Sequence, residues 1–189
     1  MPRLIYLTNV SLDGYIEDGE GRFDWSVPDE DLHQFFNDLV RPVGTFLYGR
    51  RLYETMAVWE TDPSFAADSP VGAEFAALWQ AADKVVWSTT LEAPVTARTH
   101  IERTFDPAAV RALKDAATGD LAIGGAELAG HAFRAGLVDE VRLIWHPVLV
   151  GGGKPALPDG VRTDLDLLDQ RTFARGYVYV RYAVRPAAD

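Results

Sequence analysis

Residues 121–136 read LAIGGAELAGHAFRAG, and this stretch decides the fold class. Leu121–Ile123 is short and wholly apolar, which predicts a buried strand. The pair Gly124-Gly125 ends that strand, and the residues after it have helical spacing up to about Gly136. A strand that passes through a glycine turn directly into a helix is typical of an α/β domain with a parallel sheet.

The same alternation of strand and helix runs through most of the chain. Apolar runs predict further strands at Leu4–Val10, Val43–Tyr48, Asp83–Thr89 and, more weakly, Thr99–Phe105. Helices are predicted from Pro28 onward and over Arg50–Val58, Phe75–Ala82 and Asp106–Ala117.

Two strands are predicted next to each other near the end of the chain. Val138–Val150 has the pattern of a long strand that is kinked at Pro147. Tyr177–Val184 alternates apolar and polar residues, as a half-buried antiparallel strand does. The sequence therefore predicts one α/β domain over residues 1–189, with a mostly parallel sheet and antiparallel C-terminal strands.

Composition excludes several classes of protein. The chain has no cysteine, which rules out disulfides, thiol nucleophiles and cysteine-bound metal clusters. Its formal net charge of −10 argues against a nucleic-acid partner. No signal-peptide pattern and no run of about 20 apolar residues is present, so we expect a soluble cytoplasmic protein that does not bind membranes.

Three predicted strand ends carry residues that suit a phosphate-bearing ligand. Arginines follow the first of these ends, as Gly49-Arg50-Arg51, and a guanidinium group is a fork-shaped donor for phosphate. Hydroxyls follow the second, as Ser88-Thr89, and the third is the Gly124-Gly125 pair, which lets a ligand approach the backbone.

Each of these three motifs also has a plain structural interpretation. A glycine can serve only the turn, an arginine can be solvated, and hydroxyls can cap a turn. Ligands of an open α/β sheet, however, bind at the carboxyl ends of the strands, where all three motifs fall. Together they indicate a dinucleotide that lies across that edge of the sheet.

Other catalytic motifs are not supported. The run Gly151-Gly152-Gly153-Lys154 lacks the full spacing of a phosphate-binding loop, and no nucleophile-elbow motif is present. The four histidines are scattered along the chain, which argues against a zinc site. We interpret His146, just before Pro147, as a structural residue at the strand kink.

Three stretches in this order resemble the dihydrofolate reductase-like superfamily: residues 4–16, LIYLTNVSLDGYI, residues 47–56, LYGRRLYETM, and residues 123–128, IGGAEL. The turn SLDG at 11–14 and the stretch HPVLVGGG at 146–153 are similar to one branch in particular. That branch contains the reductase domain of the bifunctional riboflavin-biosynthesis deaminase-reductase. The resemblance covers essentially the whole chain, but the zinc signature of the deaminase half is absent.

The resemblance implies a three-layer α/β sandwich that binds NADPH. It also implies hydride transfer to a C=N or C=O bond of a pterin- or aminopyrimidine-like heterocycle. Asn9 and Ile16 would contact the nicotinamide end, and Gly49, Arg50 and Arg51 would hold phosphates, including the 2′-phosphate. Contacts to the adenosine half, the pyrophosphate and the nicotinamide ribose would come from Ser88, Thr89, Ile123, Gly124, Gly125, Ala126, Glu127 and Leu128.

Three acids are candidates for assisting protonation of the substrate. Asp13 lies in the turn after the first strand, where it is also an ordinary turn former. The stretch WSVPDE at 25–30 resembles the Trp-x-x-Pro-x-Asp segment of true dihydrofolate reductases. Glu30, or else Asp31, would then bind the amino-pyrimidine edge, although both also suit the solvated first turn of a helix.

One departure from the family leaves a second function open. Reductases of this type usually carry Thr where this chain has Leu52, so a hydroxyl contact to phosphate is missing. The alternative is a catalytically silent ligand- or nucleotide-binding protein of the same fold. The resemblance further implies a homodimer, for which the strand Tyr177–Val184 is the first candidate surface.

Overall fold

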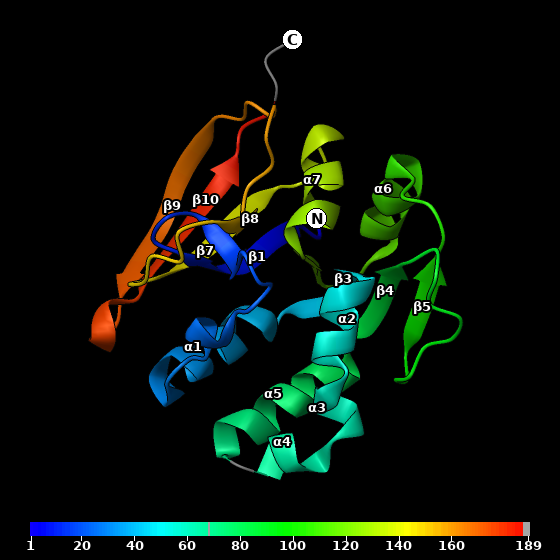
Figure 1. The fold of residues 1–189 in the computed structure, drawn as a ribbon. Coiled ribbons are helices and arrows are strands. Elements are labelled where there is room, and N and C mark those ends of the chain that lie inside the picture. Colours follow the sequence, from blue (N-terminus) through cyan, green and yellow to red (C-terminus); the bar gives the residue numbers. More distant parts are fainter. Residues whose placement is uncertain (68, 187–189) are drawn as a thin grey trace.

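An eight-stranded sheet forms the centre of the protein, with the strand order β5-β4-β3-β6-β1-β7-β10-β9 (Figure 1). The computed structural model describes residues 1–67 and 69–186. The strands of this sheet are β1 (Leu4–Ser11), β3 (Val43–Gly49), β4 (Asp83–Trp87), β5 (Thr99–Glu102), β6 (Asp120–Gly124), β7 (Glu140–His146), β9 (Leu165–Thr172) and β10 (Val178–Val184).

Neighbouring strands from β5 through β7 are all parallel. β10 is antiparallel to both β7 and β9, which gives the antiparallel C-terminal pair that the sequence predicted. A small separate ribbon pairs β2 (Tyr15–Asp18) with β8 (Gly153–Pro155). The predicted α/β class with a mostly parallel sheet is therefore confirmed.

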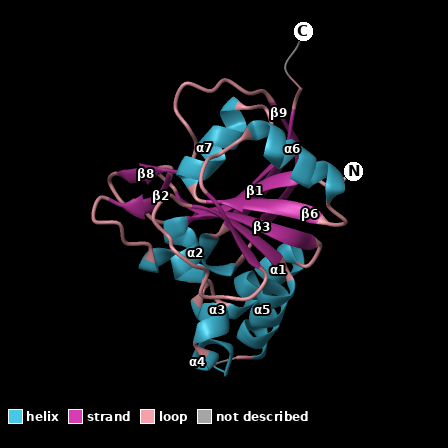
Figure 2. Ribbon diagram, turned by 90° about the vertical axis from the view of Figure 1, so that its right-hand side faces the viewer, coloured by secondary structure: helices cyan, strands magenta, loops and turns pink. Residues whose placement is uncertain are grey.

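Helices cover both faces of the sheet, so the molecule has three layers (Figure 2). One face packs against α6 (Pro107–Ala116) and α7 (Ala126–Arg134). The other packs against α1 (Glu30–Val40) and α5 (Pro70–Ala81). The short helices α2 (Arg50–Met56), α3 (Val58–Thr61) and α4 (Pro63–Ala67) continue this second layer, and two 3₁₀ turns are η1 (Asp24–Ser26) and η2 (Ala174–Gly176). Within the described residues, no helix is long and apolar enough to cross a membrane.

Helix starts follow the capping signals in the sequence. The Asp29 carboxylate accepts a hydrogen bond from the backbone N–H of Leu32 at 3.0 Å, which caps α1. Ser69 caps α5 in the same way, with Pro70 in the first turn. This helix therefore begins earlier than the predicted Phe75, because its cap lies upstream of the amphipathic run.

The end of the chain differs from the prediction in two places. β7 ends at His146 instead of continuing through a kink, since Pro147 has no N–H to donate to a neighbouring strand. β9 was not predicted at all. Every residue of β9 is exposed, so the strand carries no alternating pattern that a sequence could reveal.

The position of β9 limits how the predicted dimer surface could serve. The Tyr177–Val184 segment forms β10, and both edges of β10 are already paired, with β7 and β9. It therefore has no free edge to offer a second copy. The free edge at this end of the sheet belongs to β9, whose Leu165, Leu167 and Leu168 are exposed.

A buried carboxylate joins three strands at the amino ends of the parallel strands. Glu140, at the start of β7, has a side chain only 5% exposed. It accepts hydrogen bonds from Arg142 on β7 and Arg181 on β10 at 2.8 Å, and from Arg3 just before β1. Arg3 also binds Asp120 at the start of β6. Burial alone would raise the pKa of Glu140, but the hydrogen bonds from Arg181 and Arg142 outweigh it and lower the pKa to about 2.

Replacing Glu140 with Gln should lower the Tm by roughly 10 °C at neutral pH. The substitution leaves the buried guanidinium group of Arg142 and the partly exposed ones of Arg3 and Arg181 without their shared counterion, a loss of about 3–5 kcal/mol. Because the folded-state pKa is depressed, this contribution is complete above the usual glutamate pKa and is lost as pH falls toward 2. Thermal unfolding of both proteins at neutral pH and near pH 3 measures the difference, which should shrink in acid. Asp166→Asn, which breaks the exposed pair with Arg185, is the control and should change Tm little.

We expect the homodimer that the family resemblance implies, but through β9. A second sheet added at this edge would cover exposed leucines and pair free backbone groups. Size-exclusion chromatography with light scattering should give twice the chain mass of 20.8 kDa. Leu167→Asp should give the monomer mass, whereas Phe65→Asp, also at an exposed apolar residue but on α4, should not. A wild-type monomer contradicts this expectation.

Candidate active-site cleft

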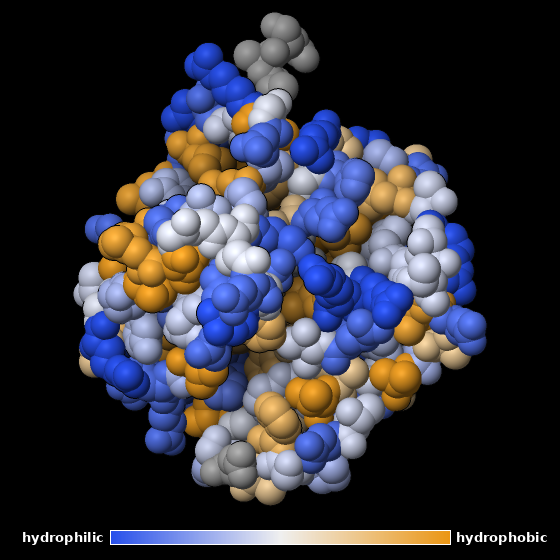
Figure 3. Space-filling model, viewed as in Figure 1, coloured by the Kyte–Doolittle hydropathy of each residue, from blue (hydrophilic) through white to orange (hydrophobic). Residues whose placement is uncertain are grey.

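A cleft of about 1060 Å³ opens at the carboxyl ends of β1, β3, β4 and β6. These four strands are neighbours in the sheet, in the order β4-β3-β6-β1, so residues that are far apart in the sequence meet there. In Figure 3 the middle of the face shown is hollowed, with hydrophilic side chains beside it. The cleft is lined by every residue predicted to bind the cofactor: Asn9, Ile16, Gly49, Arg50, Arg51, Ser88, Thr89, Ile123, Gly124, Gly125, Ala126, Glu127 and Leu128.

The glycine pair shapes one wall of the cleft. Gly125 has a φ of +84°, a conformation that side chains other than glycine rarely adopt. A Cβ at Gly124 would lie 2.5 Å from Cδ2 of Leu52, so glycine here leaves room for that side chain. No side chain caps α7, which starts directly after the pair. Its first residues therefore bring unpaired backbone N–H groups to the lining of the cleft.

Leu52, in the first turn of α2, lies against Gly124 at the end of β6. Its side chain packs against the apolar cluster that contains Tyr48, and both residues line the cleft. The position where related reductases carry Thr is therefore at the cleft surface. A threonine hydroxyl at this position would face the same wall as Gly124.

Among the described residues, three arginines and one lysine line the cleft, and each contacts an acceptor. Arg50 binds Glu54 at 2.8 Å and the hydroxyl of Thr90 at 2.6 Å. Arg103 donates to the backbone carbonyls of Ser88 and Leu91.

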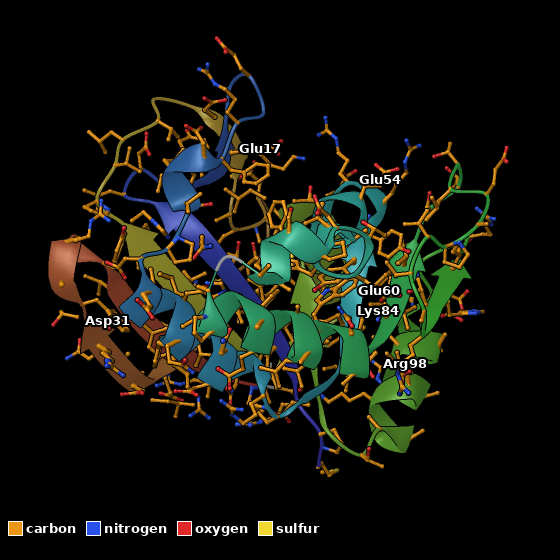
Figure 4. All side chains as sticks on the ribbon, turned by 90° about the horizontal axis from the view of Figure 1, so that it is seen from below. Glu17, Asp31, Glu54, Glu60, Lys84 and Arg98 are labelled. Atoms are coloured by element: carbon orange, nitrogen blue, oxygen red, sulfur yellow. The ribbon has the colours of Figure 1, made fainter. Side chains whose placement is uncertain are left out.

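The other two basic residues share one acid. Glu17, on the β2–β8 ribbon, lies 3.0 Å from Nζ of Lys154 and 3.7 Å from Arg51. Figure 4 shows Glu17 and Glu54 along the same edge of the molecule. The cleft thus combines exposed arginines with carboxylates that balance them.

The structure does not bring the three predicted catalytic acids to this cleft. The Asp13 carboxylate accepts hydrogen bonds from the backbone N–H groups of Val150 and Gly151, so it ties the turn after β1 to the loop after β7. A hydrogen bond with the Ser11 hydroxyl, together with these N–H groups, lowers the pKa of Asp13. Glu30 and Asp31 lie exposed in the first turn of α1, and Figure 4 shows Asp31 well away from Glu54.

Two acids of the cleft were missed by sequence reasoning, Glu17 and Glu54. Glu17 meets Lys154 only because β2 pairs with β8, and no local pattern signals that pairing. Glu54 follows Arg50 by one helical turn, a spacing that does predict an ion pair. Across residues 1–67 and 69–186, no three His, Asp or Glu side chains are arranged to hold a metal ion.

Comparison with known proteins agrees with this architecture. The family model of the RibD C-terminal domain matches residues 2–179. The protein is 32% identical over 181 residues to YyaP of Bacillus subtilis strain 168, a protein described as uncharacterized, and the match covers 95% of this chain and 94% of that one.

Three solved structures share the fold. One from Shewanella sp. PV-4, named provisionally as a riboflavin biosynthesis protein, has a TM-score of 0.76 at 21% identity, over 97% of this chain and 99% of that one. A pyrimidine reductase-like protein from Corynebacterium diphtheriae has a TM-score of 0.66 at 13% identity, over 98% and 92%. A diaminohydroxyphosphoribosylaminopyrimidine deaminase/5-amino-6-(5-phosphoribosylamino)uracil reductase from Thermotoga maritima has a TM-score of 0.65 at 16% identity. That match covers 97% of this chain and 57% of the Thermotoga protein.

The resemblance seen in the sequence is thereby confirmed. The fold is the dihydrofolate reductase-like fold, and the chain belongs to the RibD C-terminal domain family.

Proposed function

We propose that the protein is an NADPH-dependent reductase that transfers a hydride to a C=N or C=O bond of a pterin- or aminopyrimidine-like molecule. One observation carries the proposal: the residues carried over from the family as cofactor contacts all line one cleft. They come from four strand ends and from the segment after β1, so only the folded chain assembles them. Membership of a reductase-domain family supports the same conclusion.

The cleft fits a dinucleotide with several phosphates. Its volume of about 1060 Å³ slightly exceeds the roughly 300–1,000 Å³ of sites for drug-sized ligands. Arg50 and Arg51 supply guanidinium groups, which bind phosphate by two parallel hydrogen bonds. The Gly124-Gly125 turn allows close approach to the backbone, and the uncapped start of α7 offers N–H donors. α2 has only seven residues, so we assign its contribution to the two arginines and not to the helix itself.

The protein's part in such a reaction is mainly positioning. Bound NADPH would supply a hydride from its nicotinamide ring. Asn9 and Ile16 would orient that ring, while Leu7, Phe36 and Phe46 provide an apolar lining that excludes water near the reacting atoms. None of Asp13, Glu30 and Asp31 lines the cleft, so the proposal assigns no proton donor among these three acids.

Leu52 favours a second candidate, a catalytically silent nucleotide- or ligand-binding protein. It places a methyl group at the wall where the family's reductases carry a hydroxyl. The two candidates differ in turnover. A reductase oxidises NADPH when dihydrofolate or 5-amino-6-(5-phosphoribosylamino)uracil is added, as followed by absorbance, whereas a silent protein binds NADPH without oxidising it.

Binding of NADPH should depend on the arginine pair. A titration that follows the fluorescence of the five tryptophans, of which Trp87 lines the cleft, should show saturable binding. NADH, which lacks the 2′-phosphate, should bind at least about tenfold more weakly, and so should NADPH to the double variant Arg50→Ala/Arg51→Ala. Arg98→Ala removes an exposed arginine that pairs with Asp83 outside the cleft, and it should bind NADPH as the wild type does. Equal NADPH affinity in the wild type, the double variant and Arg98→Ala would contradict the proposed phosphate site.

Leu52→Thr should strengthen NADPH binding by about tenfold, since it restores a hydroxyl donor at the cleft wall. It should also lower the Tm, because a smaller polar side chain replaces a leucine that packs against an apolar cluster. Leu52→Val has nearly the same volume as threonine without the hydroxyl. If Leu52→Val also binds NADPH more tightly than the wild type, the gain comes from the room that a smaller side chain leaves and not from a hydrogen bond of the hydroxyl.

A further inference from the structure

One part of the cleft is lined by apolar side chains. They come from β1 and β3 and from the helices α1, α2 and α5, which lie on one side of the sheet (Figure 1). Six of these side chains line the cleft and pack in one apolar cluster, and we call them the apolar arm: Leu7, Phe36, Val40, Phe46, Met56 and Phe75. The phosphate contacts proposed for the cofactor involve none of the six.

The apolar arm combines a buried base with a partly open rim. Val40, Phe46 and Phe75 are at most 5% exposed, yet they still line the cleft. Leu7 and Phe36 pack against them and are only partly buried. Water in such a space finds few hydrogen-bond partners, so an apolar group that displaces it gains free energy in proportion to the area that it covers.

The apolar arm opens next to the expected position of the nicotinamide ring. Leu7 and Asn9 are two residues apart on β1, so their side chains share one face of the sheet, and both line the cleft. Asn9 is one of the two residues that we propose to orient the ring. A substituent on the reacting heterocycle can therefore extend past Leu7 into the arm.

The charged residues of α2 lie away from the apolar arm. Met56 follows Leu52 by one helical turn, so both residues lie on one face of α2 and pack against the apolar cluster. Arg50 and Glu54 are also one turn apart, and they pair with each other at 2.8 Å on the opposite face of the helix. This ion pair therefore does not face Met56.

α1 has the same arrangement. Phe36 and Val40 lie one turn apart and bring one face of the helix to the cleft. Arg41, directly after α1, pairs with Asp38 and Glu74. Among the described residues of α1, no charged side chain lines the cleft. An anionic group in the apolar arm would thus lose its water without gaining a counterion, which is costly.

We propose that the apolar arm holds an uncharged aryl substituent of the heterocyclic substrate, in a place that does not accept a phosphate-bearing substituent. The proposal rests on the proposed function, whose substrate class it narrows. An aryl group suits the arm because the rings of Phe36 and Phe75, 6.0 Å apart between centroids, can pack against it edge-on. The substrate in the name of the Thermotoga reductase, a phosphoribosylamino uracil, carries a phosphate instead.

Three pterins that share one ring system and differ only in the substituent at carbon 6 test the apolar arm. 6-Phenylpterin carries an aryl group, 6-methylpterin a small apolar group, and 6-hydroxymethylpterin phosphate an anion. Titration of the wild type, followed by the fluorescence of the pterin, should show 6-phenylpterin bound at least about tenfold more tightly than 6-methylpterin. The phosphate should bind no more tightly than 6-methylpterin, because the arm offers it no counterion.

Matched variants test whether the phenyl group lies in the apolar arm. Phe36→Ala removes one wall, so the preference for 6-phenylpterin over 6-methylpterin should fall below about threefold. Phe35→Ala removes the same ring from the neighbouring position of α1. Phe35 packs against Phe173 and Tyr179 and does not line the cleft, so this control should keep the tenfold preference. Should Phe36→Ala lack a cooperative thermal transition, Met56→Gln takes its place, since it keeps the length of the side chain and makes the arm polar.

Three results would overturn the proposal. The first is equal affinity of the wild type for 6-phenylpterin and 6-methylpterin, or binding of none of the three pterins. The second is tighter binding of the phosphate than of 6-methylpterin. The third is a tenfold preference for 6-phenylpterin that survives in folded Phe36→Ala or, where that variant does not fold, in Met56→Gln.

The NADPH titration of the wild type distinguishes failure of the apolar arm from failure of the proposed function. A wild type that prefers 6-phenylpterin but binds no NADPH would contradict the reductase and support the arm. NADPH binding and oxidation without a preference for 6-phenylpterin would contradict the arm alone.

Discussion

Three arginines converge on the buried carboxylate of Glu140, and the remaining architecture depends on this arrangement. It joins β1, β7 and β10 at the amino ends of the parallel strands, and Arg3 extends it to β6 through Asp120. A strand that slid by one residue would leave buried charges without partners, so the network holds the register of the sheet centre. The cleft lies at the opposite edge of the sheet, where the parallel strands end.

Much of the cleft could be predicted from the sequence because topology alone decides where strand ends meet. Gly49, Ser88 and Gly124 each follow a recognisable apolar run, and all parallel strands deliver their carboxyl ends to one edge. The acids could not be placed in this way. Asp13 is held by backbone groups 137 and 138 residues further along the chain, and Glu17 by the pairing of two very short strands. Contacts between residues so far apart in the sequence leave no local pattern.

Two features near the end of the chain leave no pattern in the sequence. β9 has no buried face, so period-two alternation, the usual signature of a strand, is absent. His146 is buried, but a sequence records neither whether a polar atom has a partner nor which loop covers it. Periodicity identifies elements that bury one side. It does not reveal an edge strand that buries neither side, or a polar atom that loops enclose.

The strand order also governs how the chain comes together during synthesis. β1 is apolar and lies at the centre of the sheet, yet both of its neighbours, β6 and β7, begin more than a hundred residues later. At translation rates of about 5–20 residues per second, β1 leaves the ribosome roughly 6–25 s before its partners exist. Closing a loop of that length is a slow, entropically costly step. The strand on which the finished sheet is centred is thus, in the nascent chain, an unpaired apolar segment that chaperones or other chains can capture.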